Sequence, residues 1–218
     1  MRTIAVMLAL GLVASLCGCA TAGYQRASQA SSEIGRARVV TINAHQDLVA
    51  AVHAVQNLTA KETTDLRPPY QSFAAAVKGL DAQVQELPIR GRAIRKRGNA
   101  YIAAWQEDLG DFRNPDIRAL SAERRREVAE SFQRLDSEVL ATETSLRPLL
   151  AALKDMRLYV SIDLTASGVT SAQELAGRIS TQAVEAGQHL QSLLAELDRV
   201  AAALSPMRHA KETPAPTK

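Results

Sequence analysis

Residues 128–160 read VAESFQRLDSEVLATETSLRPLLAALKDMRLYV, and buried-type side chains recur along them at alternating steps of four and three residues. One polar residue, Thr142, takes a place in this series. Steps that average 3.5 residues keep one face of an α-helix apolar, which is typical of coiled-coil packing. The series predicts a long helix with a buried stripe of Val128, Phe132, Leu135, Val139, Thr142, Leu146, Leu149, Leu153, Met156 and Val160.

The same spacing continues in three other stretches, over residues 32–59, 66–112 and 171–205. The second of them keeps its phase through Pro88, and Pro148 interrupts residues 128–160 without a change of phase. A proline inside a helix removes one hydrogen bond and bends the helix. We therefore expect one long helix over 66–112 that is kinked near Pro88, or two coaxial helices, rather than a domain boundary there.

Local signals predict where these helices begin and end. Residues 114–116 (Asn-Pro-Asp) are typical of a turn, and Ser121 is a candidate N-cap. Residues 163–170 are expected to form a loop, followed by a capping box between Ser171 and Glu174. Ser205-Pro206 is expected to end the last helix, and the polar residues 206–218 are expected to be a disordered tail.

Together these patterns predict an all-α fold, an elongated antiparallel four-helix bundle with coiled-coil-like heptad packing over residues 32–205. Its helices are expected at about 32–59, 66–112, 121–162 and 171–205. Composition agrees, because 38 of the 218 residues are Ala and only 8 are aromatic. If the second and third helices fold back near residue 116, opposite charges meet in the pairs Arg95–Glu138, Arg97–Asp136, Arg90–Glu143, Glu107–Arg126 and Asp108–Arg125.

The first nineteen residues have the pattern of a secretion signal. Arg2 supplies a positive start, and residues 4–16 form an uncharged apolar run too short to span a bilayer. The run ends in Leu-Cys-Gly-Cys and resembles a bacterial lipobox, which implies cleavage after Gly18 and acylation of Cys19. Ala20 follows the Cys, which by resemblance to Gram-negative lipoproteins favours the outer membrane. The alternative is a plain signal peptide cut near Ala20 and Ala22.

These features predict a lipoprotein signal peptide at residues 1–18 and a lipidated N-terminus with a short tether at residues 19–31. Cys17 would leave with the signal and Cys19 would become a thioether. The mature chain would then have no thiol left for a disulfide or a metal site.

The largest charge cluster predicts a contact with a partner or an anionic surface. It comprises Arg90, Arg92, Arg95, Lys96 and Arg97. The alternative is a solvated helix face that is neutralised by Asp136, Glu138 and Glu143. Nucleic acid is not expected as a partner outside the cytoplasm.

Catalytic and metal-binding patterns are not found. The Glu-x-x-His pairs of di-iron bundles are missing, since Ile42, Ala50 and Ala186 precede the three histidines of the helical stretches by three residues. A Gly-x-Ser-x-Gly elbow and a Walker loop are missing too. His45 and His53 are kept as a candidate pair of metal ligands. We expect no enzyme activity, no cofactor and no metal.

Several short segments resemble a family of uncharacterised proteobacterial envelope proteins, known as a domain of unknown function or as lipoproteins. They are residues 104–109 (AWQEDL), 114–118 (NPDIR), 146–150 (LRPLL), 163–165 (DLT) and 168–169 (GV). The resemblance covers about residues 24–204 and implies a helical, coiled-coil envelope protein. It brings no substrate, cofactor or functional residue. This chain has Ala166 where the resemblance leads us to expect Pro.

The expected function is that of a lipoprotein on the periplasmic face of the outer membrane, with a non-enzymatic structural or adaptor role toward an envelope protein. The alternative is a bundle that binds a lipid or a small apolar ligand between its helices, with Gly91 and Gly98 lining the gap. Those two glycines otherwise allow a neighbouring helix to approach closely. Whether the chain forms a homo-oligomer is left open by the sequence.

Overall fold

The computed structural model of the chain describes residues 19–60 and 64–206, and all regular elements within them are helical. The all-α class is therefore confirmed. The expected signal peptide at residues 1–18 and the tail from residue 207 lie outside the described residues. The elements are α2 (Cys19–Thr59), α3 (Arg67–Asp108), the 3-10 turn η1 (Leu109–Asp111), α4 (Pro115–Ile162), α5 (Ala166–Ser171) and α6 (Gln173–Leu204).

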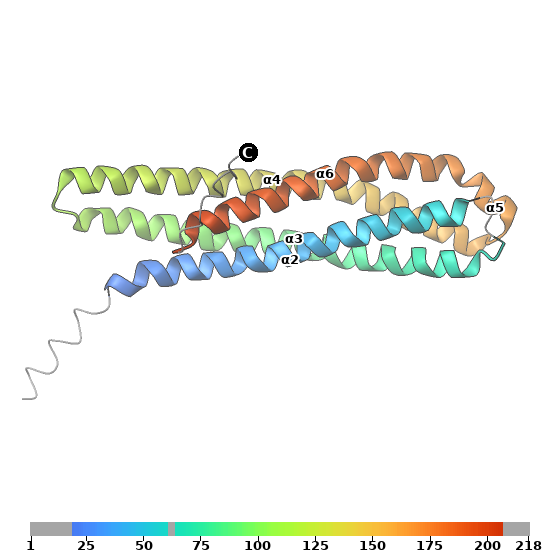
Figure 1. Cartoon of the computed structure of the whole chain (residues 1–218), viewed down its shortest axis with the longest axis horizontal. Helices are drawn as coiled ribbons and strands as arrows, with labels where there is room; N and C mark the ends of the chain where they lie inside the picture. The colour runs from blue at the N-terminus through green and yellow to red at the C-terminus, as the bar shows by residue number, and fades with distance from the viewer. Residues whose placement is uncertain (1–18, 61–63, 207–218) are drawn as a thin grey trace, which may run out of the picture.

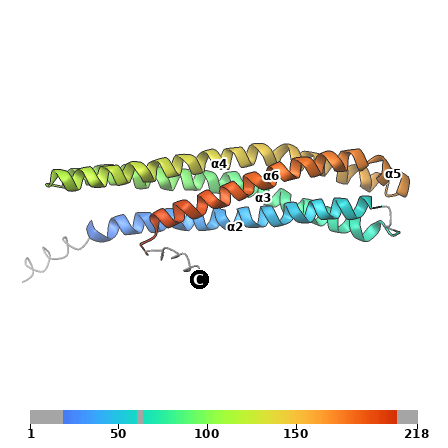
Figure 2. The ribbon, with the colours of Figure 1, turned by 45° about the horizontal axis from the view of Figure 1, so that its top comes forward.

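The four long helices lie side by side along one axis and form an elongated bundle (Figures 1 and 2). Helix α2 packs against α3 and α6, and α4 packs against the same two helices. Neighbours in this ring run antiparallel, as three contacts between distant residues illustrate. Arg38 of α2 binds Asp198 of α6 at 2.7 Å, Lys154 of α4 binds Asp81 of α3 at 2.7 Å, and Arg134 of α4 lies 3.5 Å from Glu196 of α6.

The predicted apolar stripes form the core. All ten stripe residues between Val128 and Val160 are buried, including Thr142, whose hydroxyl donates to the backbone carbonyl of Glu138 at 2.8 Å. A polar side chain can occupy a heptad position without a large cost because this hydrogen bond satisfies it. The stripes from Ile34 to Leu58 and from Ile179 to Leu204 are buried in the same way.

Both internal prolines lie within unbroken helices, Pro88 in α3 and Pro148 in α4. Two glycines of α3, Gly91 and Gly98, face side chains of α4. A Cβ atom at Gly91 would lie 2.7 Å from Val139 Cγ1, and one at Gly98 would lie 2.7 Å from Phe132 Cδ1. The two positions therefore permit close helix packing, and the side chains of α4 fill the space beside them.

The first helix begins earlier than the sequence indicates. Helix α2 starts at Cys19, so residues 19–31 continue the helix instead of forming a separate tether. This segment contains no proline and several alanines, which favour helix. Ala30 is buried with the core, and Arg26 pairs with Asp108 of α3, so tertiary contacts hold the extension in place.

The start of α4 also differs from the prediction. The N-cap is Asn114 rather than Ser121, and its side chain accepts hydrogen bonds from the backbone N–H groups of Asp116 and Ile117. Pro115 then occupies the first helical position, where its missing N–H group costs little. Ser121 instead accepts a hydrogen bond at 2.9 Å from the indole N–H of Trp105.

The connection between α4 and α6 is more helical than predicted. Residues 163–170 contain most of α5 rather than a loop, and the hydroxyl of Thr165 caps α5 by accepting from the N–H of Gly168. The predicted capping box is wrong, because α6 begins at Gln173 after Ala172, without a side-chain cap. Ser171 belongs to α5, where its hydroxyl donates to the carbonyl of Ser167. The end of α6 at Leu204 agrees with the stop expected at Ser205-Pro206.

The antiparallel contact of α3 with α4 is as predicted, but its charge pairs are different. Arg95 binds Asp136 rather than Glu138, and the close contacts of Gly91 and Gly98 have the same register. The Gly91–Val139 and Gly98–Phe132 contacts lie about three residues from the predicted register, whereas the Asp81–Lys154 pair lies about two residues from it in the opposite direction. The other predicted partners bind elsewhere: Arg90 to Glu33 and Glu86, Arg97 to Gln29, Asp108 to Arg26, and Arg126 to Glu123.

Candidate functional site

The end of the bundle that holds the start of α2 is the first candidate region. Cys19 is the first residue of α2, and the chain joins the bundle there without a break in the helix. The turn between α3 and α4 and the end of α6 lie at the same end (Figure 1). The ion pair of Arg26 with Asp108 ties α2 to α3 at this level. Any group bound to Cys19 would thus be close to the α3–α4 turn.

Aromatic side chains gather near the α3–α4 turn. The rings of Tyr101 and Trp105 are 5.5 Å apart and tilted by 50°, and both pack partly buried against the core. Burial raises the pKa of the Tyr101 hydroxyl above its usual value. The hydrogen bond of Trp105 to Ser121 joins α3 to the first turns of α4. Packing of these rings against the core stabilises the turn.

The basic residues of α3 form the second candidate region. We call Arg90, Arg92, Arg95, Lys96 and Arg97 the basic strip. The structure brings acids to some of them, since Arg95 Nε donates to Asp136 at 2.8 Å and Arg90 binds Glu86 at 2.5 Å. Arg92 and Lys96 are exposed and form no ion pair within residues 19–60 and 64–206. The strip is therefore only partly neutralised.

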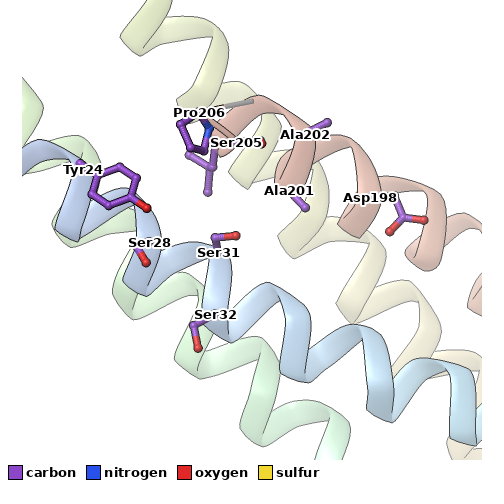
Figure 3. A pocket seen from close by; sticks show the side chains of 10 residues that line it. Tyr24, Ser28, Ser31, Ser32, Asp198, Ala201, Ala202, Ser205 and Pro206 are labelled. Carbon is purple, nitrogen blue, oxygen red and sulfur yellow. The ribbon is translucent and has the colours of Figure 1, made fainter. Parts of the chain in front are cut away.

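A groove of about 680 Å³ opens between the start of α2 and the end of α6. Figure 3 shows Tyr24 of α2 and Pro206 on opposite sides of it, with Ser28, Ser31 and Ser32 along α2. Asp198 lines the groove and accepts a hydrogen bond from Arg38 at 2.7 Å. No histidine or cysteine is among the described residues that line it.

Glu196 of α6 is a buried acid that the sequence analysis missed. It is 4% exposed and pairs with Arg199 on its own helix and with Arg134 of α4. Burying a carboxylate is costly unless cations compensate it, and here both arginines keep their outer atoms in water. The spacing of three residues between Glu196 and Arg199 was the signal in the sequence that could have indicated this ion pair. Their arrangement joins α4 to α6, and within it Glu196 Oε1 is buried without a hydrogen-bond partner, 3.5 Å from Arg134 Nε.

The two candidate metal residues of α2 lie in a groove between α2 and α6. His45 and His53 both line this groove of about 340 Å³, together with the apolar Val49 and Val52. Within the part of the chain that the structure describes, no three His, Cys, Asp or Glu side chains are close enough to hold a metal ion. The same residues include no helix long and apolar enough to cross a membrane.

The relationship of the chain to known proteins rests on one family model. A model described as a protein of unknown function, DUF2959, matches residues 19–207. The chain belongs to the DUF2959 family. Searches of the curated proteins and of the solved structures found no match. The DUF2959 match begins at Cys19, the residue at which α2 begins, and it runs past the end of α6.

Proposed function

We propose that this DUF2959 protein is a lipoprotein on the periplasmic face of the outer membrane, with a non-enzymatic adaptor role. The observation that carries the proposal is the position of Cys19. A lipobox-like sequence precedes this residue, the family match begins there, and a helix of 41 residues starts there. We infer that the proteobacterial lipoproteins that the sequence resembles share this arrangement, in which a long helix follows the acylated cysteine.

Acylation of Cys19 would provide a stable anchor. Each CH₂ group buried in a bilayer contributes about 0.8 kcal/mol, and two or more acyl chains hold a protein where one chain is marginal. Helix α2 follows Cys19 directly, so the anchor would attach to a rigid element. At about 1.5 Å per residue, the 41 residues of α2 span about 60 Å. The bundle would thus present long side faces to the periplasm.

The proposal includes a more specific description of the fold. We infer that α2, α3, α4 and α6 act as one four-helix bundle with coiled-coil-like packing, and that α5 closes the turn. Heptad stripes and the ring of contacts support it. A rigid bundle of this kind suits an adaptor, because its faces keep a fixed spacing from the membrane.

The basic strip is the surface that we propose for an acidic region of an envelope protein. Lys96 is 12 residues before the end of α3, which corresponds to about 18 Å along the helix. Electrostatic attraction between exposed charges is screened beyond about 8 Å at physiological salt. In a bundle that stands on the membrane, Arg92 and Lys96 would therefore attract a protein rather than lipid head groups.

Ligand binding between the helices is the alternative, and the packing weighs against the gap expected for it. Val139 and Phe132 occupy the space beside Gly91 and Gly98. An apolar molecule there would have to displace them. Co-purification of a stoichiometric lipid with the bundle would favour this alternative.

Crosslinking in living cells, followed by mass spectrometry of the tagged protein, tests the adaptor role. We expect one dominant envelope protein with the native chain, and its loss with Cys19→Ser, which cannot be acylated. The double variant Arg92→Glu/Lys96→Glu should reduce its capture several-fold. Lys78→Glu is the matched control, because Lys78 lies on the same helix, is exposed, and forms no ion pair with any described residue.

Two results would contradict the proposal. Equal capture with native chain and Cys19→Ser would show that the anchor does not position the partner. Equal losses with Lys78→Glu and with the double variant would exclude the basic strip as a specific surface. The mass of the mature native chain provides an independent readout, since acylation of Cys19 adds the mass of the lipid.

A further inference from the structure

We propose that the turn between α3 and α4 enters the surface of a zwitterionic phospholipid bilayer beside the lipid on Cys19, and that this second contact holds the bundle upright. The inference rests on the proposed function, because it needs Cys19 at the membrane. It adds a membrane-contact site formed by the first turns of α4 and by η1. We call residues 109–120 the hairpin tip.

The position of the hairpin tip is the first argument. Arg26 and Asp108 pair with each other, and Cys19 lies seven residues before Arg26, about 10 Å further along α2. The hairpin tip begins directly after Asp108. Both views of the bundle show it reaching further along the long axis than the start of α2 (Figures 1 and 2). A membrane surface at Cys19, perpendicular to this axis, would meet the tip.

Exposed apolar side chains on the hairpin tip are the second argument. Ile117 is 46% exposed and Leu120 is 69% exposed, and their spacing of three residues places them on one side of α4. They are uncovered because α6 ends near Arg124, whose guanidinium donates to the carbonyl of Ala203 at 3.0 Å. Helix α4 has 48 residues and α6 has 32, so α6 does not accompany the first turns of α4.

Aromatic residues and balanced charges fit a phospholipid surface. Tyr24 is 62% exposed and follows Cys19 by five residues, and Trp105 lies one turn before the tip. Tyrosine and tryptophan are enriched where proteins meet the membrane–water interface. The charged residues of the tip cancel, since it holds Asp111, Asp116, Arg113 and Arg118. This balance favours a zwitterionic surface over an anionic one.

The opposite end of the bundle has exposed apolar residues too, and it supplies the control. Ile162 at the end of α4 is 79% exposed, and Leu158 is 60% exposed. They lie more than forty residues along α4 from Leu120 and Ile117, respectively, which corresponds to about 60 Å. Together with the exposed Tyr159, these side chains make apolar exposure at this end at least as large as at the hairpin tip. Only the end that holds Cys19 can contact a membrane when the bundle is upright.

The anchor makes so small a contact effective. Two apolar side chains bind a bilayer weakly by themselves. Once Cys19 holds the chain at the membrane, the tip meets the bilayer at a high effective concentration, and weak contacts then become populated. The tip thus sets the orientation of a protein that the lipid already retains.

A depth measurement on vesicles tests the inference. The full chain is purified from cells in its mature form, in which an acylated Cys19 has no free thiol, and an environment-sensitive fluorophore is attached to Leu120→Cys or to Ile162→Cys. Both variants go into phosphatidylcholine vesicles that carry a nitroxide quencher on the lipid head group. We expect several-fold stronger quenching at position 120 than at position 162.

The outcomes separate this inference from the proposed function. Equally weak quenching at both positions, in a chain that floats with the vesicles, would overturn the inference and leave the anchor intact. Equally strong quenching would show a bundle that lies flat, which also overturns it. A mature chain without added lipid mass, or one that does not float, would contradict the proposed function itself. Both substituted positions are exposed, so neither variant should disturb folding.

Discussion

At one end of the bundle α3 turns into α4 through η1 and a short connection, whereas at the other end α4 reaches α6 through a separate helix, α5. The hairpin tip has no neighbour from α6, and it leaves Ile117 and Leu120 in solvent. At the α5 end, Val169 and Ala172 are buried and pack into the core. One end is thus an extension of two helices, and the other is a packed closure.

This difference separates residues whose burial stabilises the fold from residues that the fold leaves exposed. Side chains in the α5 connection contribute to the core, so changes there should reduce stability. On the hairpin tip Leu109 is buried, but Ile117 and Leu120 are exposed and contribute little to the core, and we propose that they contact the membrane. Substitutions toward either end of the bundle can be ranked by the expected size of their effects on stability.

The largest effect is expected from Gly168→Ala in α5. A Cβ atom at residue 168 would lie 2.4 Å from the backbone carbonyl oxygen of Asp163, and a backbone atom cannot rotate away as a side chain can. Overpacking of this kind costs about 1–3 kcal/mol, and we expect the upper part of that range. Urea unfolding followed by circular dichroism measures the change. A variant as stable as the native chain would show that the α5 closure is loosely packed.

The second effect is expected from Gly98→Ala, in the half of α3 nearer the hairpin tip. The new methyl group would meet the ring of Phe132, which must move, and we expect a loss of about 1–2 kcal/mol. Gly177→Ala in α6 is the matched control, because a Cβ atom there has no neighbour within 4 Å. Alanine is the better helix former by about 1 kcal/mol, so this control should stabilise the bundle. Thermal unfolding of both variants should therefore give shifts of opposite sign.

The apolar stripes could be predicted because they are a local property. Each heptad position depends only on residues three and four places away, and the structure buries the predicted series from Val128 to Val160. Helix ends depend on competing local signals. Both Asn114 and Ser121 suit an N-cap, but Pro115 follows Asn114, and Trp105 binds Ser121 from another helix.

The difference between the predicted and the observed start of α4 had a consequence for the candidate site. A third helix that begins at Ser121 would not contain Ile117 or Leu120, so the predicted helix boundaries did not indicate exposed apolar side chains beyond the end of α6. The basic strip was visible in the sequence as a run of cations. Neutralisation by Asp136 was the alternative that the sequence offered, and Asp136 does bind Arg95, but the approach of Glu33 of α2 to Arg90 was not predicted.

The third effect concerns the pair of Asp81 and Lys154, which joins α3 to α4 toward the α5 end. Hydrogen bonds from Lys154 and Gln85 hold the pKa of the Asp81 carboxyl below its usual value. A lowered pKa in the folded state stabilises the protein above the unfolded value of about 4, and this contribution is lost as the pH falls through the folded value. Both side chains are partly in solvent, so Asp81→Asn should cost only about 0.5–1 kcal/mol at neutral pH.

Urea unfolding at neutral and at acidic pH checks this sign. The native chain and Asp81→Asn should differ at pH 7 and converge in acid, as the pH falls below the unfolded value of about 4 and through the lower folded value. Asp65→Asn is the comparison within one segment: hydrogen bonds from Arg67 also lower the pKa of the Asp65 carboxyl, so its difference from the native chain should vanish in acid too, although Asp65 joins no second helix. A difference between native chain and Asp81→Asn that persists unchanged in acid would mean that packing, rather than the charge, accounts for the loss.

The smallest effect is expected from Ala166→Pro at the start of α5, and it has the opposite sign. Ala166 is the first residue of α5, where a helix leaves the N–H group without an acceptor, and Thr165 before it has φ −115° and ψ 161°, a conformation that suits a following proline. Proline restricts the unfolded chain, so we expect a gain of about 0.4–1 kcal/mol. Ala172→Pro is the matched control in the same connection, because the N–H group of Ala172 donates to the carbonyls of Gly168 and Val169. That substitution removes hydrogen bonds and should lower the melting temperature. If both prolines destabilise the chain equally, the first turn of α5 has a backbone that differs from a capped helix, and the closure at this end of the bundle is held by its buried side chains alone.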